Sequence, residues 1–114
     1  SMEKLMNDEK IYREDILTLR QVAEKLKITP HQLSELLNEK MSCNFNTYIN
    51  RYRIREAEQL LKNDPERSIL SVSYEVGFNS KSSFYEAFLK ATGKTPQKYR
   101  ADIFGGSSEE EEKK

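Results

Sequence analysis

Residues 76–88 read Val-Gly-Phe-Asn-Ser-Lys-Ser-Ser-Phe-Tyr-Glu-Ala-Phe, and they carry the most specific fold signal in the chain. Gly77 ends one short helix, because glycine adopts the left-handed backbone of a tight turn without a Cβ clash. A second helix begins at Ser80 or Lys81, with polar side chains at its start and two phenylalanines on its buried face. A short helix, a short turn and a second helix with a polar start are typical of a helix-turn-helix, whose second helix enters the major groove of DNA.

The same pattern occurs earlier in the chain, so the sequence contains an internal repeat. The equivalent positions are Ala23 and Ser73, Ile28 and Phe78, Leu33 and Phe84, Leu37 and Phe88, and Tyr48 and Tyr99. The first copy has Lys27 in place of Gly77, which costs about 1 kcal/mol if the left-handed turn is kept. Two copies in tandem indicate a helix-turn-helix pair much more specifically than one copy would.

Local signals place the expected helix boundaries. Two helices begin at capping boxes, Thr18 to Gln21 and Thr29 to Gln32, where a threonine hydroxyl and a glutamine side chain satisfy free backbone N–H groups. A longer helix over about residues 46–62 ends at Asn63-Asp64-Pro65. The other expected helices cover about residues 2–11, 68–76 and 80–92, with a last short helix from Pro96.

These boundaries predict an all-α fold of about seven helices. We expect a first helix-turn-helix subdomain at residues 2–44, a linker helix at 45–63, a second helix-turn-helix subdomain at 64–104 and a disordered tail at 105–114. The tail contains only glycine, serine and charged residues, which bury too little apolar surface to offset their ordering entropy. The predicted core includes Leu5, Met6, Ile11, Leu33, Leu36, Leu37, Tyr48, Tyr52, Phe84, Phe88 and Tyr99.

Composition excludes several classes of function. The 114 residues carry 19 basic and 19 acidic side chains, one histidine and the single cysteine Cys43, so an internal disulfide or a multi-cysteine zinc site is excluded. No apolar run is long enough to span a bilayer. The sequence has no glycine-rich phosphate loop, nucleophile–base pair or ligand cluster, so we expect no enzyme, no cofactor and no metal. A lone cysteine suits the reducing cytoplasm.

The neutral total hides an uneven charge distribution. Residues 79–100 contain only one acidic residue, Glu86, against the five basic residues Lys81, Lys90, Lys94, Lys98 and Arg100. A basic segment favours an anionic partner.

From about Leu17 to Arg100 the chain resembles the DNA-binding module of the AraC/XylS family of bacterial transcription regulators. The resemblance rests on residues 76–88, on Thr92-Gly93-Lys94-Thr95-Pro96, on Tyr99-Arg100 and on the linker run 53–61. It implies two recognition helices in successive major grooves of double-stranded DNA. It also implies that the chain is a fragment, because family members usually carry this module behind a sensing, dimerising or membrane-spanning N-terminal domain.

Outward polar residues near the two recognition helices are the candidate DNA contacts. Amide and ammonium groups can pair with purine edges, whereas cations and helix N-termini hold phosphates. The candidates for base reading are His31, Gln32, Ser34, Asn38, Asn79, Lys81, Ser82 and Ser83. The candidates for backbone contact are Thr29, Arg51, Arg55, Ser80, Tyr85, Lys94, Lys98 and Arg100.

Some alternatives stay open from the sequence. Glu35 and Glu86 either contact a base, which for Glu86 would be cytosine, or are solvated charges. Arg53 either pairs with Glu56 or Glu58 or meets a phosphate. The net charge of zero leaves a second function, a helical protein–protein adaptor that keeps the fold without strong DNA binding.

The expected partners and cellular location follow from DNA binding by a transcription regulator. RNA polymerase is a second expected partner of a transcription regulator, and we expect no small-molecule ligand in this fragment. The fragment is expected to be a monomer, and the full-length protein a dimer through the missing N-terminal domain. The expected location is cytoplasmic, with membrane anchoring through that missing part as the alternative.

Overall fold

The computed structural model describes residues 2–104 and confirms the all-α class. Within these residues there are seven α-helices, one 3-10 turn, one π-helical turn and no strand. The predicted disordered tail at 105–114 lies outside the described residues. None of the helices in residues 2–104 is long and apolar enough to cross a membrane.

The N-terminal segment differs from the single helix predicted over residues 2–11. Helix α1 covers only Met2–Asn7, and a separate 3-10 turn, η1, covers Ile11–Arg13. Lys10 between them has a left-handed backbone with φ of 50°, which interrupts the helix. The break lets Ile11 and Tyr12 enter the core while Arg13 stays exposed on the surface.

The first helix-turn-helix unit consists of α2 (Leu19–Leu26) and α3 (Pro30–Leu36). Both predicted capping boxes are present, at Thr18 and Thr29. Lys27 adopts the left-handed conformation expected of it, with φ of 63°, and its backbone N–H reaches back to α2. Helix α3 continues into the π-helical turn η2 (Leu37–Met41), after which α4 (Phe45–Asn63) begins at its N-cap Asn44.

The second unit consists of α5 (Ile69–Val76) and α6 (Lys81–Thr92), followed by α7 (Pro96–Phe104). Ser68 and Ser80 cap α5 and α6 through their hydroxyls. Gly77 has φ of 115°, a region that L side chains rarely adopt. Each helix pair therefore has the capped start and left-handed turn that its local sequence predicted.

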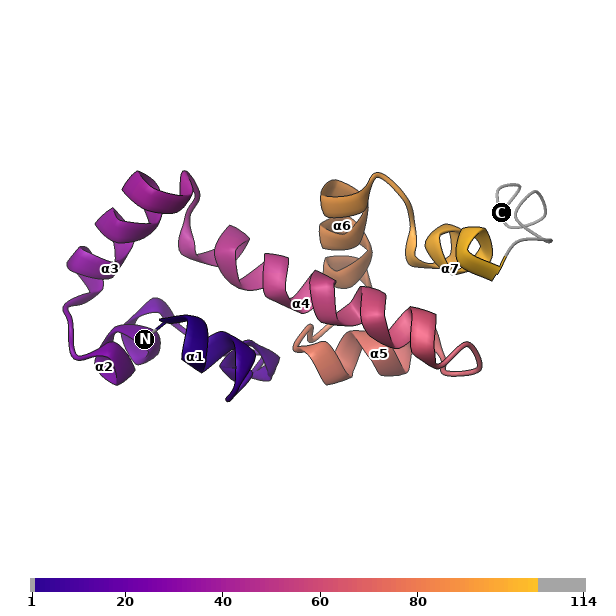
Figure 1. The fold of residues 1–114 in the computed structure, drawn as a ribbon, viewed down its shortest axis with the longest axis horizontal. Helices are drawn as coiled ribbons and strands as arrows, with labels where there is room; N and C mark the ends of the chain where they lie inside the picture. The colour runs from indigo at the N-terminus through magenta and orange to yellow at the C-terminus, as the bar shows by residue number, and fades with distance from the viewer. Residues whose placement is uncertain (1, 105–114) are drawn as a thin grey trace.

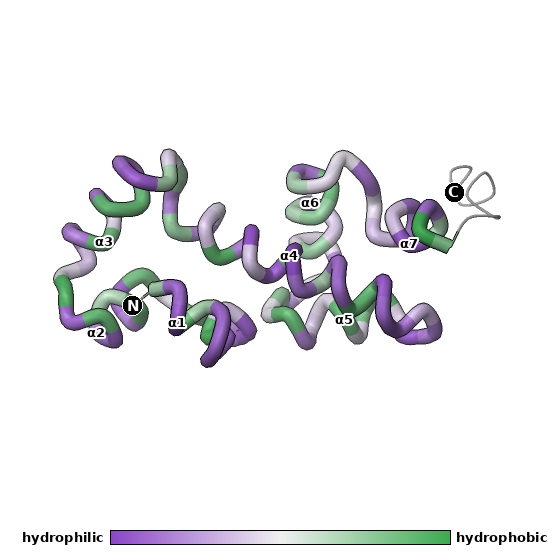
Figure 2. Tube along the Cα trace, viewed as in Figure 1, coloured by the Kyte–Doolittle hydropathy of each residue, from purple (hydrophilic) through white to green (hydrophobic). Residues whose placement is uncertain are grey.

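Two separate hydrophobic cores lie along α4, one under each unit. Tyr48 and Ile49 of α4 belong to the first core, whereas Ile54, Ala57 and Leu61 belong to the second. Figure 2 shows apolar and polar residues interleaved along the helices, as expected for short amphipathic helices that each bury one face. The linker helix is therefore a shared wall of both cores.

Three core predictions need correction. Leu36 is 38% exposed, because Leu33 and Leu37, four residues apart, occupy the buried face and Leu36 lies at its edge. Tyr52 and Tyr99 are half-buried: each packs against one of the cores but keeps part of its ring in contact with water.

The molecule is elongated, with principal extents of 49 × 23 × 21 Å. Figure 1 shows α4 along the long axis, with α3 beyond its N-terminal end and α6 standing across its middle, and with both helices running in the same general direction. The helices α2 and α5 lie on the same side of α4, beside the starts of α3 and α6. The internal repeat of the sequence thus corresponds to two units displaced along the long axis.

Candidate nucleic-acid interface

The start of α3 presents a small set of polar side chains to solvent. His31 and Gln32 are exposed, and Ser34 is half-buried. The Oε1 atom of Gln32 accepts from the backbone N–H of Thr29 at 2.9 Å, and the Thr29 hydroxyl accepts from the backbone N–H of Gln32 at 3.0 Å. Gln32 must therefore use its NH₂ group, or leave the cap, to pair with a base. Asn38 lies further along, exposed in η2.

Glu35 modifies the charge of this face. Its Oε2 atom lies 3.3 Å from Nε2 of His31, one helical turn earlier, and both side chains are well exposed. The contact becomes an ion pair only when the imidazole is protonated. A base or phosphate that approaches His31 therefore also approaches a carboxylate.

The start of α6 is more favourable for an anion. Asn79, Lys81, Ser82 and Ser83 are all exposed at or near its first turn. The Lys81 ammonium lies 5.3 Å from the centre of the Tyr85 ring, so the ring supports its orientation through a cation–π contact. The hydroxyl of Ser80 caps the helix by accepting from the backbone N–H of Ser83, and it also donates to the Ser83 hydroxyl.

An open cleft lies between α4 and α6. Its lining includes Asn79 and Ser83, which the sequence selected, and also Asn46, Asn50 and Lys90, which it did not. A neighbouring cleft is lined by Asn50, Lys90 and the candidate Arg51. The structure therefore brings Asn79, Ser83 and the α6 residue Lys90 together with polar and basic groups of α4. Glu86 lines the first cleft as well.

The basic candidates for backbone contact fall into two groups, those exposed on α4 and those held by other groups of the protein near its C-terminal end. Arg51 and Arg55 are exposed on α4, where Arg55 stacks over the Tyr52 ring at 5.2 Å and Arg51 donates weakly to Cys43 Sγ at 3.7 Å. Lys94 and Lys98 instead lie 2.6 Å and 3.4 Å from the Asp102 carboxylate.

The other two candidates near the C-terminal end are engaged within the protein. Arg100 donates to the carbonyl oxygen of Arg67 at 2.6 Å, and the Tyr85 hydroxyl accepts from Gln97. The interactions of Lys94 and Lys98 with Asp102 lower the pKa of the Asp102 carboxyl, chiefly through the hydrogen bond from Lys94. Much of the positive charge counted in residues 79–100 is therefore balanced or bound locally.

Arg53 occupies a position that neither sequence alternative anticipated. Its guanidinium donates to the carbonyl oxygens of Tyr12 and Glu14 at 2.6 Å and 2.8 Å, and lies 5.5 Å from the centre of the Phe78 ring. Burial lowers the pKa of the guanidinium from its usual value. We call the set Tyr12, Glu14, Asn50, Arg53, Gly77 and Phe78 the Arg53 junction.

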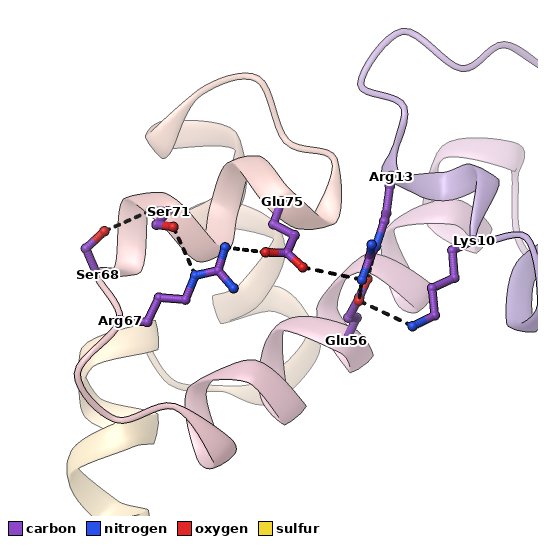
Figure 3. Close-up of polar contacts among 7 residues, drawn as sticks. All are labelled: Lys10, Arg13, Glu56, Arg67, Ser68, Ser71 and Glu75. Atoms are coloured by element: carbon purple, nitrogen blue, oxygen red, sulfur yellow. Dashed lines mark hydrogen bonds and ion pairs between the residues drawn. The ribbon is translucent and has the colours of Figure 1, made fainter.

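Beside the Arg53 junction, a chain of ion pairs joins three segments (Figure 3). Arg13 of η1 binds Glu56 of α4 and lies 3.4 Å from Glu75 of α5, which in turn binds Arg67. Burial opposes ionisation of Glu56, whose side chain is 10% exposed. Hydrogen bonds from Arg13 and Tyr12 and the charges of Arg13 and Lys10 outweigh that burial, so the pKa of Glu56 is lowered from 4.5.

The geometry now defines a class: two capped helix-turn-helix units on a shared linker helix, with their second helices exposed, form a helix-turn-helix DNA-binding domain. The profile of a family described as a helix-turn-helix domain matches residues 22–102. The chain belongs to the AraC/XylS family of transcription regulators. Its relatives are regulatory proteins, not enzymes.

Two relatives show the extent of the similarity. The melibiose operon regulatory protein of Escherichia coli is 36% identical over 84 residues, which are 74% of this chain and 28% of that protein. The Msm operon regulatory protein of Streptococcus mutans is 31% identical over 87 residues, 76% of this chain and 31% of that protein. The chain thus spans less than a third of the length of these relatives.

Solved structures agree with the fold. The C-terminal domain of AraT, a response regulator from Geobacillus stearothermophilus, matches with a TM-score of 0.75 and 31% identity, covering 82% of this chain and 77% of that one. The C-terminal domain of the two-component response regulator yesN from Fusobacterium nucleatum matches with a TM-score of 0.74 and 27% identity, covering 87% and 97%.

Proposed function

We propose that this domain binds double-stranded DNA sequence-specifically, with α3 and α6 in successive major grooves on one face of the duplex. The observation that carries the proposal is that α3 and α6 run in the same general direction across the molecule and are displaced from one another along its long axis (Figure 1). Successive turns of DNA repeat about every 34 to 36 Å, and the long axis of 49 Å has room for two units at that spacing.

The two units divide the contacts differently. The turn before α6 offers the exposed amide of Asn79, and the first turn of α6 offers the ammonium of Lys81 and the hydroxyl of Ser82; these groups suit purine edges and phosphates. Helix α3 offers His31 and Gln32, but Gln32 is held in its cap and Glu35 lies beside His31. We therefore assign the larger share of base reading to the second unit.

The cleft between α4 and α6 supplies the contacts to the DNA backbone between the grooves. Asn46, Asn50 and Lys90 line it, and Arg51 lines the adjoining cleft. Such contacts position a protein on the duplex without reading sequence. Because Lys94 and Lys98 lie against Asp102, their contribution to phosphate binding is smaller than their charge implies.

Within a full-length protein, the domain acts in regulation of transcription in the cytoplasm, with RNA polymerase as a second partner. The isolated domain is a monomer, because its two reading units are already present in one chain. Dimerisation, and membrane anchoring where it exists, belong to a further domain N-terminal to this one. We propose no small-molecule ligand for residues 2–104.

The second candidate function is a helical protein–protein adaptor. The net charge of zero and the exposed carboxylates Glu35 and Glu86 on the two recognition helices favour it. Both functions use the same fold, so only binding separates them.

The discriminating experiment compares Lys81→Ala with Lys62→Ala. Lys62 lies exposed in the last turn of α4, outside both recognition helices, and its removal changes the total charge equally. Fluorescence anisotropy then measures the affinity for duplexes enriched by selection from a random pool. Lys81→Ala is expected to weaken binding by about 5- to 150-fold, as for loss of one base contact. Unchanged binding of Lys81→Ala, or no duplex binding by the unmodified domain, would favour the adaptor.

A further inference from the structure

We propose that Arg53 is a positioning residue: it fixes the orientation of the second helix-turn-helix unit relative to the first, and thereby restricts the domain to one spacing between two DNA half-sites. The inference rests on the proposed function for its DNA readout. Its structural basis is the Arg53 junction, where the segment before α2, the linker helix and the turn of the second unit meet.

The guanidinium of Arg53 uses all three of its nitrogens. Nε donates to the carbonyl oxygen of Tyr12 at 2.6 Å, and Nη2 donates to the carbonyl oxygen of Glu14 at 2.8 Å. Nη1 donates to Oδ1 of Asn50 on the same helix at 3.2 Å, which orients the side chain. A planar fork of five donors can satisfy these acceptors together, whereas a lysine ammonium is a single point of charge.

The turn of the second unit closes directly over these bonds. A Cβ atom at Gly77 would lie 2.4 Å from the Tyr12 carbonyl oxygen and 2.8 Å from Arg53 Nε. The Phe78 ring faces the guanidinium carbon at 5.5 Å. Because Gly77 and Phe78 connect α5 to α6, a contact that fixes this turn also fixes the start of the recognition helix α6.

A second connection lies alongside the Arg53 junction. Arg13 binds Glu56 and approaches Glu75, so η1 is joined to both α4 and α5 (Figure 3). The segment 11–14 comes before the first unit in sequence, yet its backbone carbonyls bind Arg53 of the linker helix and its Arg13 side chain lies 3.4 Å from Glu75 of the second unit. Without these contacts α4 alone would join the two units, and the turn of the second unit would lose its partners before α2.

A fixed orientation has a measurable consequence on DNA. Each added base pair moves the second half-site along the axis and rotates it by about 34 to 36° around the duplex. A rigid pair of units then loses the contacts of one unit, whereas a loosely joined pair adjusts. Spacing tolerance therefore reports on the Arg53 junction, while a simple loss of stability lowers affinity equally at every spacing.

The test uses Arg53→Met, which keeps an apolar stem without donors, and Arg53→Lys, which keeps the charge and one donor group. Lys62→Ala serves as the charge-matched control on the same helix. Duplexes carry the two enriched blocks at the selected spacing and at spacings longer or shorter by one and two base pairs. Affinity at each spacing is divided by affinity at the selected spacing, and circular dichroism verifies that each variant is folded.

The unmodified domain and Lys62→Ala are expected to lose about tenfold in affinity for one added base pair, the cost of a lost base contact or more. For the same added base pair, Arg53→Met is expected to lose less than about threefold in affinity, and Arg53→Lys to lose an amount between those of Arg53→Met and the unmodified domain. A folded Arg53→Met with the same spacing penalty as the unmodified domain would overturn the proposal. If Arg53→Met does not fold, the same comparison with Arg53→Lys decides.

A measurement without DNA separates this inference from the proposed function. Spin labels are attached to the substitutions Glu39→Cys and Leu89→Cys, both at exposed positions, after Cys43→Ser removes the native thiol. The two labels report the distance between the two units. The proposal expects a narrow distance distribution that broadens in Arg53→Met or Arg53→Lys. A distribution of unchanged width in both variants would overturn it. If selection finds no paired blocks, the proposed function fails and the label distances alone decide this inference.

Discussion

The Nε atom of Arg53 lies 2.6 Å from the carbonyl oxygen of Tyr12, across 41 residues of sequence. Gly77 packs against both atoms, so three distant segments share one point of contact. The relationship explains why glycine is needed there for two reasons, its left-handed φ of 115° and the absence of a side chain. Gly93, which ends α6, needs glycine only for its left-handed φ.

Gly77→Ala and Gly93→Ala therefore form a matched pair. Alanine at Gly93, where φ is 82° and no heavy atom lies within 4 Å of a Cβ, should cost about 1 kcal/mol of unfolding free energy. Alanine at Gly77 adds a clash with backbone and should cost about 3 kcal/mol. Urea unfolding followed by circular dichroism measures both. Equal costs would show that the close approach at Gly77 contributes nothing.

Glu56 should make stability depend on acid pH. Its pKa is lower in the folded state than its usual 4.5, so its contribution is present above that value and is lost as pH falls through the folded-state pKa. Glu56→Gln should lower the unfolding free energy by about 1 to 3 kcal/mol at pH 7, since Arg13 loses a charged partner. The difference from the unmodified domain should shrink below pH 4.5.

The control for this prediction is Glu66→Gln. Glu66 lies exposed between α4 and α5, so its neutralisation should change the unfolding free energy by no more than about 0.5 kcal/mol at either pH. An equal and pH-independent loss for both variants would contradict the ion-pair account of Glu56.

Replacing Ser73 by alanine should stabilise the folded domain. The side chain is fully buried in α5, and its hydroxyl has no hydrogen-bond partner among the described residues. A buried hydroxyl without a partner costs about 1 to 3 kcal/mol. Ala23 occupies the equivalent position in the first unit and is fully buried as well. Ser73→Ala should therefore raise the thermal midpoint, and a lower midpoint would reveal a partner for the hydroxyl in solution.

Local rules explain why much of this fold could be predicted from the sequence. The capping boxes at Thr18 and Thr29 and the turn at Gly77 depend on residues three or four positions apart, so a sequence pattern reports them directly. The break at Lys10 was missed, because its cause is the burial of Ile11 and Tyr12 against distant helices.

The site could be predicted less completely. The outward polar residues of α3 and α6 follow from helical periodicity, whereas the cleft residues Asn46, Asn50 and Lys90 required the packing of α4 against α6. Arg53 was ambiguous, because helical spacing favours a pairing with Glu56 that the tertiary contacts replace with two carbonyl oxygens. The charge of Lys94 also overstated its availability for a DNA phosphate, because the pairing of Lys94 with Asp102 forms only once α7 is folded.

Duplex binding should depend strongly on salt. Neutralising about 4 to 6 phosphates gives a slope of log affinity against log salt near −4 to −5. Arg51→Ala should make this slope shallower by about 1, because Arg51 is exposed beside the cleft. Lys94→Ala should change it less, since the Lys94 ammonium lies 2.6 Å from the Asp102 carboxylate. Equal changes for the two variants would contradict this division of the cations.

Both helix-turn-helix units should read bases. The most direct test is selection from a random duplex pool of about 20 base pairs at near-physiological salt, followed by sequencing of the enriched molecules. We expect two short conserved blocks about one helical turn apart, with the stronger block read by α6. A single block would contradict reading by both units, and the absence of enrichment would contradict sequence-specific DNA binding by this domain.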